Sequence, residues 1–174
     1  MVGMSGAGKS EVAAVFAATG YARIRFGDVT DDEIARRKLP PGEASERQVR
    51  ELLRREQGME AYARLNLPRI EAALQSSDVV IDGLYSWEEY RFLKERFAEN
   101  LVVVAVYASP QTRYARLAAR RIRPLTPPQS ASRDRAEIEN SHKGGPIAMA
   151  DVTIVNEGSV ADLQSQTRKV MAGL

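Results

Sequence analysis

Residues 3–10 read Gly-Met-Ser-Gly-Ala-Gly-Lys-Ser, a glycine-rich run that ends in a lysine and a serine. Glycines allow the backbone to curl so that several N–H groups point at one anion. In this pattern Lys9 reaches the β- and γ-phosphates of a nucleotide, and the Ser10 hydroxyl is placed to bind Mg²⁺. A helical pattern follows from Glu11 and would point its positive end at the same anion. The sequence therefore predicts a phosphate-binding loop.

Two aspartates follow predicted strands and are candidates for chemistry beside this loop. Asp82 ends an apolar run and precedes Gly83, so it either holds the Mg²⁺ shell or forms an Asp-Gly turn. Asp28 follows Gly27 at the lip where open α/β sheets bind ligands. It could accept the proton of an attacking hydroxyl or orient an acceptor. It could also cap the next helix, because Thr30 crowds the same helix start.

Arginines outnumber lysines by 20 to 5, and many fall within residues 113–135. Positioned guanidinium groups stabilise the charge that spreads over the oxygens during phosphoryl transfer, although a solvated basic face is the plainer reading. The arginines of this segment are Arg113, Arg116, Arg120, Arg121, Arg123, Arg133 and Arg135. The helical spacing i, i+3, i+7 puts Arg113, Arg116 and Arg120 on one face of the predicted helix. The predicted catalytic residues are Lys9, Asp28, Arg116, Arg120 and Arg133.

The loop that follows the last predicted strand, Asn156 to Ser159, either packs against the adenine base or caps the final helix. The Asn-Lys-x-Asp sequence that reads guanine is absent from this position, which favours ATP over GTP. The predicted nucleotide-binding residues are Gly3, Met4, Ser5, Gly6, Ala7, Gly8, Lys9, Ser10, Glu11, Arg116, Asn156 and Gly158. The predicted metal ligands are Ser10 and Asp82.

Composition sets the class of protein. The 174 residues suit a single domain, 1–174, and the chain has no cysteine, which excludes disulfides and a zinc cage and fits a reducing cytoplasm. The net charge of +2 does not call for nucleic acid. The longest apolar run, 101–108, is too short to cross a bilayer. We expect a cytoplasmic monomer or small homo-oligomer with a small-molecule partner and no membrane or nucleic-acid partner.

Apolar runs alternate with amphipathic stretches, which predicts a parallel sheet covered by helices on both faces. The expected strands are 22–26, 78–82, 101–107 and 151–155. The expected helices are 10–18, 30–37, 43–57, 58–75, 86–97, 111–121, 128–140 and 159–172. With a strand leading into the loop, this is a three-layer α/β/α fold with a five-stranded parallel sheet.

The strand that leads into the loop is a difficulty, since Met1 and Val2 alone precede Gly3. Three readings stay open: residues missing from the sequence, a misassigned start, or a central strand reduced to a stub. Two further segments have predicted roles. Residues 28–75 form a helical acceptor-binding insertion, and residues 116–140 form a mobile lid.

The chain resembles a P-loop kinase, and specifically dephospho-CoA kinase and its uncharacterised relatives. Residues 3–10 match the phosphate loop. Phe26-Gly-Asp28, followed by Glu33-Ile-Ala-Arg36, resembles the strand-end aspartate and helix where that family activates the acceptor hydroxyl. Residues 107–120 resemble the entry into the lid. Leu125-Thr126, Arg133 and the run 150–159 resemble its lid helix, last strand and adenine-side loop.

The acceptor side departs from this pattern. The strand 78–82 runs into Gly83-Leu-Tyr-Ser-Trp87, whereas dephospho-CoA kinases have Pro-Leu-Leu-Phe-Glu there. Adenylate kinases share Asp82-Gly83 but continue with Phe-Pro-Arg, and here Ser86 stands in place of that phosphate-gripping arginine. The candidate acceptor-binding residues are Gly27, Asp28, Arg36 and Arg64.

The resemblance implies a phosphotransferase that moves the γ-phosphoryl of ATP, with Mg²⁺, to a small nucleotide-like acceptor. The alternative is a regulatory NTPase that switches a partner surface without such an acceptor. The altered loop 83–87 motivates this alternative.

Overall fold

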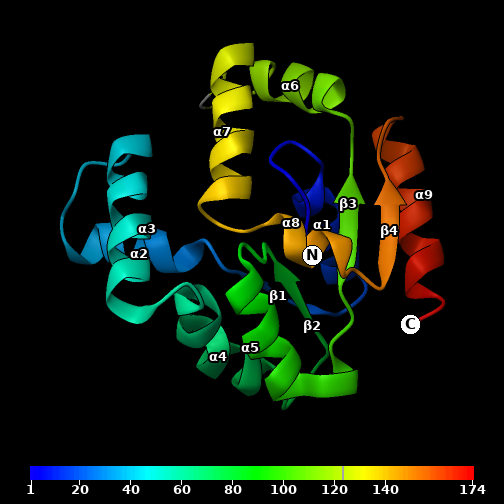
Figure 1. The fold of residues 1–174 in the computed structure, drawn as a ribbon. Coiled ribbons are helices and arrows are strands. Elements are labelled where there is room, and N and C mark those ends of the chain that lie inside the picture. The colour runs from blue at the N-terminus through cyan, green and yellow to red at the C-terminus, as the bar shows by residue number, and fades with distance from the viewer. Residues whose placement is uncertain (123) are drawn as a thin grey trace.

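The computed structural model describes residues 1–122 and 124–174, and it leaves the side chain of Glu43 undescribed, so Arg123 of the arginine-rich segment lies outside the described residues. The strands in the described part form two parallel pairs (Figure 1). The strands are β1 (Ala22–Arg25), β2 (Val79–Asp82), β3 (Val104–Tyr107) and β4 (Val152–Val155). β1 pairs with β2, and β3 pairs with β4.

The predicted five-stranded sheet is not seen in the described residues. Met1 and Val2 lie between the two pairs instead of forming a strand. Val2 makes an isolated parallel bridge to Ala105. On the other side, the Leu84 N–H donates to the Met1 carbonyl over 3.1 Å. Two residues are too few for a ladder of normal strand length, so the stretch before Gly3 joins the pairs through two hydrogen bonds on each side, which link Val2 with β3 and Met1 with Ile81 and Leu84.

The helices fall close to their predicted places. They are α1 (Lys9–Ala18), α2 (Asp28–Arg36), α3 (Glu43–Gln57), α4 (Ala61–Ala73), α5 (Trp87–Phe97), α6 (Pro110–Ala118), α7 (Pro127–Glu139), α8 (Gly144–Ala148) and α9 (Val160–Met171), with a 3₁₀ turn at Ala98–Asn100. The short α8 was not predicted, because its glycines and proline are typical of a loop. Ser86 and Ser159 cap α5 and α9 by accepting a backbone N–H three residues on.

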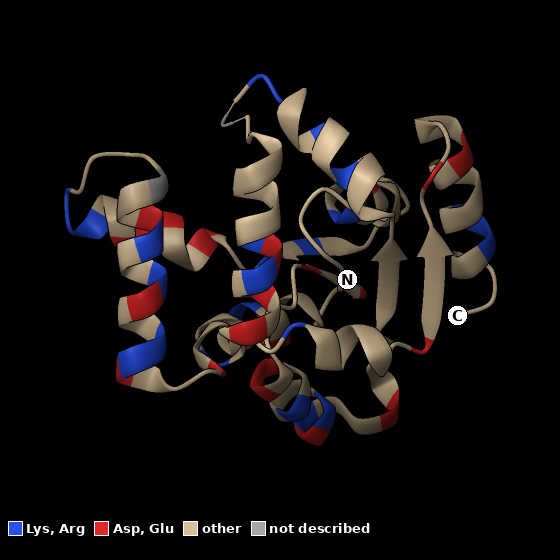
Figure 2. Ribbon diagram, turned by 45° about the horizontal axis from the view of Figure 1, so that its top comes forward, with Lys and Arg blue, Asp and Glu red and all other residues tan. Residues whose placement is uncertain are grey.

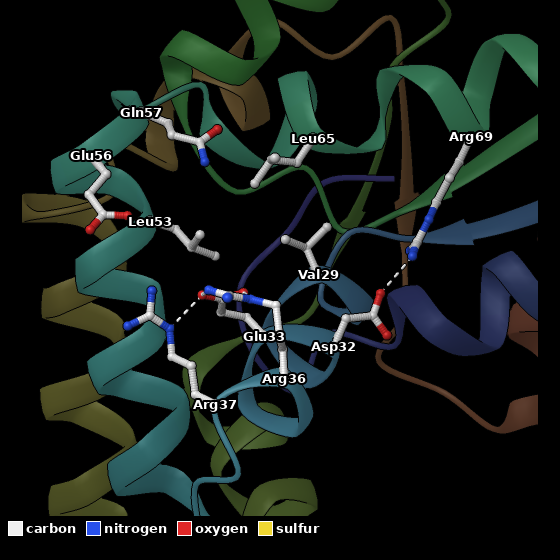
Figure 3. Close-up of a pocket in the computed structure, with 10 residues that line it drawn as sticks. All are labelled: Val29, Asp32, Glu33, Arg36, Arg37, Leu53, Glu56, Gln57, Leu65 and Arg69. Atoms are coloured by element: carbon white, nitrogen blue, oxygen red, sulfur yellow. Dashed lines mark hydrogen bonds and ion pairs between the residues drawn. The ribbon is translucent and has the colours of Figure 1, made fainter.

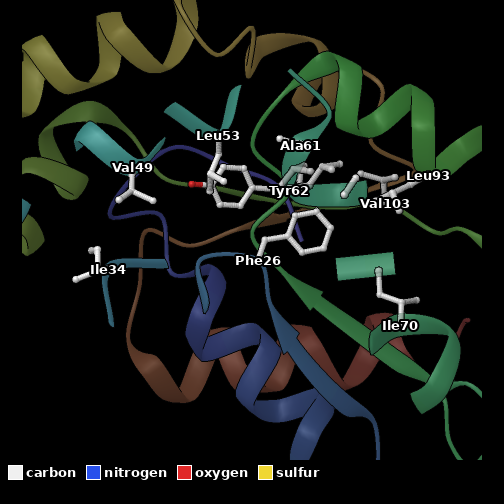
Figure 4. Packing of buried hydrophobic residues seen from close by; sticks show 13 residues of the cluster. Phe26, Ile34, Val49, Leu53, Ala61, Tyr62, Ile70, Leu93 and Val103 are labelled. Carbon is white, nitrogen blue, oxygen red and sulfur yellow. The ribbon is translucent and has the colours of Figure 1, made fainter. Parts of the chain in front are cut away.

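The central strands β2 and β3 pack side chains on both faces. In β2, Val80 packs with α1 and α9, whereas Val79 and Ile81 pack against the cluster around Phe26 and Tyr62 (Figure 4). In β3, Val104 and Val106 take the first face and Ala105 the second. This alternation is the period of two that a strand imposes. Helices therefore cover both faces, which confirms the mixed α/β class.

The segment 28–75 builds α2, α3 and α4, which stand to one side of the strands, and α6 and α7 lie above the first loop (Figure 1). A hydrogen bond of 2.6 Å between the Thr30 and Tyr62 hydroxyls ties α2 to α4. The charged residues of α7 lie in its second half, the end that reaches the loop (Figure 2). The loop at residues 3–10 thus lies beneath a charged helix end.

Candidate functional site

The loop 3–10 adopts a conformation that two of its glycines make possible. Gly3 has φ +138° and Gly8 has φ +106°, backbone values that residues with a Cβ rarely adopt. A Cβ on Gly3 would meet the Val106 carbonyl oxygen at 2.3 Å, and one on Gly8 would meet the Asn156 Nδ2 at 2.3 Å. The loop is therefore packed against β3 on one side and against the 156–159 loop on the other.

Lys9 lies at the start of α1 with its ammonium folded over the loop. Its Nζ donates to the Gly3 carbonyl at 2.8 Å and to the Met4 carbonyl at 3.1 Å. Loss of hydration and the charge of Lys143 lower the pKa of Lys9, whereas Glu137 and Asp82 raise it, and together these effects bring it to about 7. A bound phosphate would add negative charge beside this ammonium and favour its protonated form.

Helix α7, part of the predicted lid, is fixed to the loop through a buried ion pair with α6. Arg113 of α6 holds Asp134 of α7 in a bidentate contact, with NH1–Oδ1 of 2.7 Å and NH2–Oδ2 of 2.6 Å. The same NH1 donates to the Ser5 carbonyl at 3.2 Å. The Tyr114 hydroxyl donates to Asp134 at 3.0 Å. The predicted lid is thus tied directly to the loop it was expected to cover.

A second contact joins α7 to the predicted nucleotide-binding residue Ser5, and it involves two residues, Glu137 and Lys143, that the sequence did not single out. Glu137 accepts the Ser5 N–H at 3.2 Å and the Ser5 hydroxyl at 2.5 Å. Lys143 pairs with Glu137 at 2.9 Å, and both side chains are largely buried. Burial would raise the pKa of Glu137, but Lys143, the Ser5 hydrogen bond and Lys9 together lower it to about 2. Glu137 is therefore a carboxylate at neutral pH.

The predicted arginines Arg120 and Arg133 lie near this carboxylate. Arg133 Nε is 3.4 Å from a Glu137 oxygen. The pKa of Arg120 is lowered by loss of hydration and by Arg133, and Glu137 opposes this. The expectation that Arg120 shares a helix face with Arg113 was wrong. Helix α6 ends at Ala118, where the chain turns back so that the Leu125 N–H donates to the Leu117 carbonyl.

The structure brings together three of the predicted nucleotide-side residues. Arg116 donates to the Asn156 carbonyl at 3.0 Å, to the Asn156 side-chain oxygen at 3.2 Å and to the Gly158 carbonyl at 3.4 Å. The Asn156 amide donates to the Ala7 carbonyl at 2.7 Å. Arg116 therefore holds the 156–158 loop, which Asn156 joins to the loop 3–10.

The predicted metal ligands lie at the two ends of this site. Asp82 is buried at the end of β2, where it pairs with Arg23 of β1, and its charge acts on Lys9. Ser10 is exposed in the first turn of α1, followed by exposed Glu11. Among the described residues no group of three or more acidic, histidine or cysteine side chains forms a metal cluster. Mg²⁺ held by one or two protein oxygens, phosphates and water requires none, so these donors fit it.

On the acceptor side, Asp28 begins α2 and is half-exposed. Its Oδ1 accepts a hydrogen bond from Arg25 Nε at 2.6 Å, and Arg25 also pairs with Asp31. Gly27 lies against Arg25 and the Tyr85 hydroxyl, each about a van der Waals contact from where its Cβ would be. The Asp28 carboxylate is therefore held by an arginine of β1 at the end of that strand.

Arg36 and Arg64 are not brought together. Arg36 forms a two-point ion pair with Glu33 of its own helix, both contacts 2.6 Å. It lines a cavity of about 340 Å³ between α2, α3 and α4 (Figure 3). Arg64 pairs with Glu60 at 3.0 Å and lies 5.4 Å from the Phe92 ring centroid. Arg64 is not among the residues that line this cavity.

The family comparison agrees with the geometry of the loop. A model described as an AAA domain matches residues 1–140. A UPF0200 protein of Thermococcus kodakarensis is 34% identical over 98% of this chain and 94% of its own length. A UPF0200 protein of Methanopyrus kandleri is 38% identical over 100% of this chain and 88% of its own length. The chain belongs to both families.

Solved structures share the fold of this UPF0200 chain. The crystal structure of TT1252 from Thermus thermophilus aligns with a TM-score of 0.67 and 21% identity over 99% of this chain and 95% of that one. A gluconokinase from Sinorhizobium meliloti 1021 aligns with a TM-score of 0.56 and 17% identity, over 99% and 91% of the two chains. The expected P-loop kinase-like fold is confirmed by these structures and by the AAA domain match over the loop. Among the described residues, no helix has the length and apolar character that crossing a membrane requires.

Ser86, which stands where adenylate kinases have their phosphate-gripping arginine, is buried in this UPF0200 chain. The Ser86 hydroxyl donates to the Met59 carbonyl at 2.9 Å and accepts the Glu89 N–H at 3.0 Å. Burial raises the pKa of Glu89 to about 7. Its Oε1, like the Arg54 Nε, is a buried atom without a hydrogen-bond partner. The sequence did not single out Glu89 or Arg54. A glutamate three residues after a serine is typical of a helix cap, so Glu89 gave no other signal.

Proposed function

We propose that the chain transfers the γ-phosphoryl group of ATP, with Mg²⁺, to a small nucleotide-like acceptor. The observation that carries this proposal is the gathering of cationic groups at a phosphate-binding loop, with Lys9 below and Arg133 of the lid above. Such groups stabilise the charge that develops on the transferred phosphoryl. The fold shared with a gluconokinase supports a kinase. Dephospho-CoA is one acceptor to test, and it remains a prediction.

The proposed reaction is an in-line displacement at the γ-phosphorus. An acceptor oxygen forms a bond to phosphorus, the bond to the β–γ bridging oxygen breaks, and ADP leaves. Asp28 takes the proton of the acceptor hydroxyl. Lys9, Arg120 and Arg133 stabilise the phosphoryl oxygens. Closure of α7 over the loop excludes water, which would otherwise compete as the acceptor.

The proposed nucleotide site uses both ends of the loop. The backbone of residues 3–10 cradles the phosphates, and the 156–158 loop lies on the adenine side. The contacts of Arg116 favour a role in holding that loop over a role at the transferred phosphate. Ser10 and Asp82 would hold Mg²⁺. When bound, the ion would draw negative charge off the β- and γ-phosphate oxygens.

The proposed acceptor site lies between Asp28 and the loop. Arg36 and Arg64 would need to leave their ion pairs with Glu33 and Glu60 to bind an acceptor phosphate. Both arginines are more than half exposed, and Glu33 would keep its second partner, Arg37, so breaking these contacts costs little, typically below about 1 kcal/mol. A small-molecule partner therefore stays part of the proposal. A cytoplasmic location rests on the cysteine-free composition alone.

One observation favours the rival regulatory NTPase. Ser86 is fully buried in bonds to Met59 and Glu89, so the position where adenylate kinases grip the acceptor phosphate is closed to a ligand. A switch protein would hydrolyse ATP without a small-molecule acceptor. The two functions differ in what accelerates the release of ADP.

The test is ADP release measured with Mg·ATP and a panel of acceptors that includes dephospho-CoA and nucleoside monophosphates. We expect one acceptor to raise the rate, Lys9→Ala to abolish the reaction, and Asp28→Asn to reduce transfer far more than ATP affinity. A rate that ignores every acceptor and responds instead to a protein partner would establish the switch. Wild-type turnover by Lys9→Ala would end the donor-site assignment.

A further inference from the structure

A carboxylate of the chain itself occupies two donors of the phosphate-binding loop, both on Ser5. Glu137 reaches down from α7 and takes both the backbone N–H and the hydroxyl of Ser5. The two residues are 132 positions apart in the sequence. Inward-pointing N–H groups of such loops are anion-binding groups. Here the anion they hold is a side chain of the lid.

The positive charges around Glu137 outnumber the single negative charge of its carboxylate. Lys143 lies 2.9 Å and Arg133 3.4 Å from its oxygens. Lys9 and Arg120 also act on this group electrostatically. The four cations repel one another, and this is one reason that the pKa of Lys9 is low. A terminal phosphate carries about two negative charges and three acceptor oxygens, so it would balance these cations better than one carboxylate does.

The buried position of Lys143 has no other evident use. Its side chain is 4% exposed, and its ammonium lies 5.3 Å from the Tyr85 ring centroid. Burying an ammonium is costly unless a counter-charge is present. Glu137 supplies that charge in this structure. A phosphate at the same place would supply it instead, and the lysine would then belong to the nucleotide site.

We propose that Glu137 is an internal stand-in for the terminal phosphate of the nucleotide, and that ATP must displace it from Ser5 and Lys143 to bind. This inference rests on the proposed nucleotide-binding function. Ser5 lies in the first half of the loop, away from Gly8 and the start of α1, where the phosphates nearer the nucleoside bind. The contact therefore competes with the last phosphate of ATP more than with ADP, which is one phosphate shorter.

The test is isothermal titration calorimetry of the full chain with a non-hydrolysable ATP analogue, ADP and inorganic tripolyphosphate, each with Mg²⁺. Glu137→Gln keeps the shape of the side chain but removes its charge. Because hydrogen bonds to a charged group are the strong ones, we expect the analogue and tripolyphosphate to bind about tenfold more tightly, with a smaller gain for ADP. Exposed Glu139→Gln on the same helix is the matched control and should bind as the wild type does.

Two further variants keep the test decisive. Glu137→Asp retains the charge but draws it back from Ser5, so it should also bind the analogue more tightly even if Glu137→Gln folds poorly. Lys143→Met should weaken the analogue more than ADP. Unchanged or weaker binding of the analogue by both Glu137 variants would overturn the inference while leaving the proposed function in place. If the wild type binds none of the three ligands, the proposed function itself fails.

Discussion

The bidentate pair between Arg113 and Asp134 allows a quantitative prediction. Both side chains are buried, with Arg113 4% exposed, and their two contacts are 2.7 and 2.6 Å. Arg113→Met keeps much of the side-chain volume and removes the charge. The carboxylate of Asp134 is then left buried, with the Tyr114 hydroxyl at 3.0 Å as a donor but without its counter-charge.

The expected cost follows from this burial. Removing one partner of a buried ion pair typically costs about 3–5 kcal/mol, because the other charge stays desolvated. For a domain of this size, that loss lowers the melting temperature by about 6–20 °C. The exposed pair of Arg47 and Glu51, 2.9 Å apart, is the matched control. Arg47→Met should cost less than about 1 kcal/mol.

The assay is urea unfolding followed by far-UV circular dichroism at pH 7. The double variant Arg113→Met, Asp134→Leu should regain most of the lost free energy, since it leaves no charge buried. Two results would refute the reasoning. One is a loss for Arg113→Met no larger than that for Arg47→Met. The other is a double variant that is as unstable as the single one.

The remaining predictions concern two positions. The raised pKa of Glu89, about 7 against a usual 4.5, means that the folded state holds a proton that the unfolded state has lost. The contribution of Glu89 to the free energy of unfolding is then fully present below about pH 4.5, and it falls by about 3 kcal/mol as the pH rises to 7. In urea titrations, Glu89→Gln should flatten the dependence of the unfolding free energy on pH, whereas exposed Glu95→Gln should leave it unchanged. Gly8→Ala should cost about 2–3 kcal/mol, from the left-handed backbone and the clash with Asn156, whereas Gly20→Ala, with φ +104° and nothing within 4 Å, should cost about 1. Equal losses of unfolding free energy for the two variants would show that the Asn156 side chain moves aside without cost.

Local patterns were sufficient to predict much of the fold. The glycines, Lys9 and Ser10 lie in one short stretch, so their spacing alone identifies the loop. The strands were found because their apolar runs are nearly continuous, as expected where both faces are covered. The sheet was predicted as one five-stranded unit because a phosphate loop normally hangs from a full strand. In the structure, Val2 makes one isolated bridge, to Ala105, and Met1 makes hydrogen bonds to Ile81 and Leu84 instead.

The parts that sequence reasoning missed depend on contacts between distant positions. Glu137, near the end of α7, carries no local signal that it will meet Ser5, and Lys143 lies in a stretch that reads as a polar loop. Arg120 and Arg133 were predicted near the loop from the chemistry of phosphoryl transfer and from the family resemblance, and the group that gathers them in the structure is Glu137.

The two contacts of α7 with the loop differ in a way that bears on how the lid works. Asp134 is held by a buried two-point ion pair whose arginine also binds the Ser5 carbonyl. Glu137, three residues along the same helix, touches the Ser5 N–H and hydroxyl, the groups that an incoming phosphate would take. The first contact is costly to break, and the second is replaceable by a ligand of the same charge. If nucleotide displaces Glu137 as we propose, the Glu137 end of α7 would yield while the Asp134 contact stays intact, so the proposed lid would adjust about a fixed point instead of swinging free.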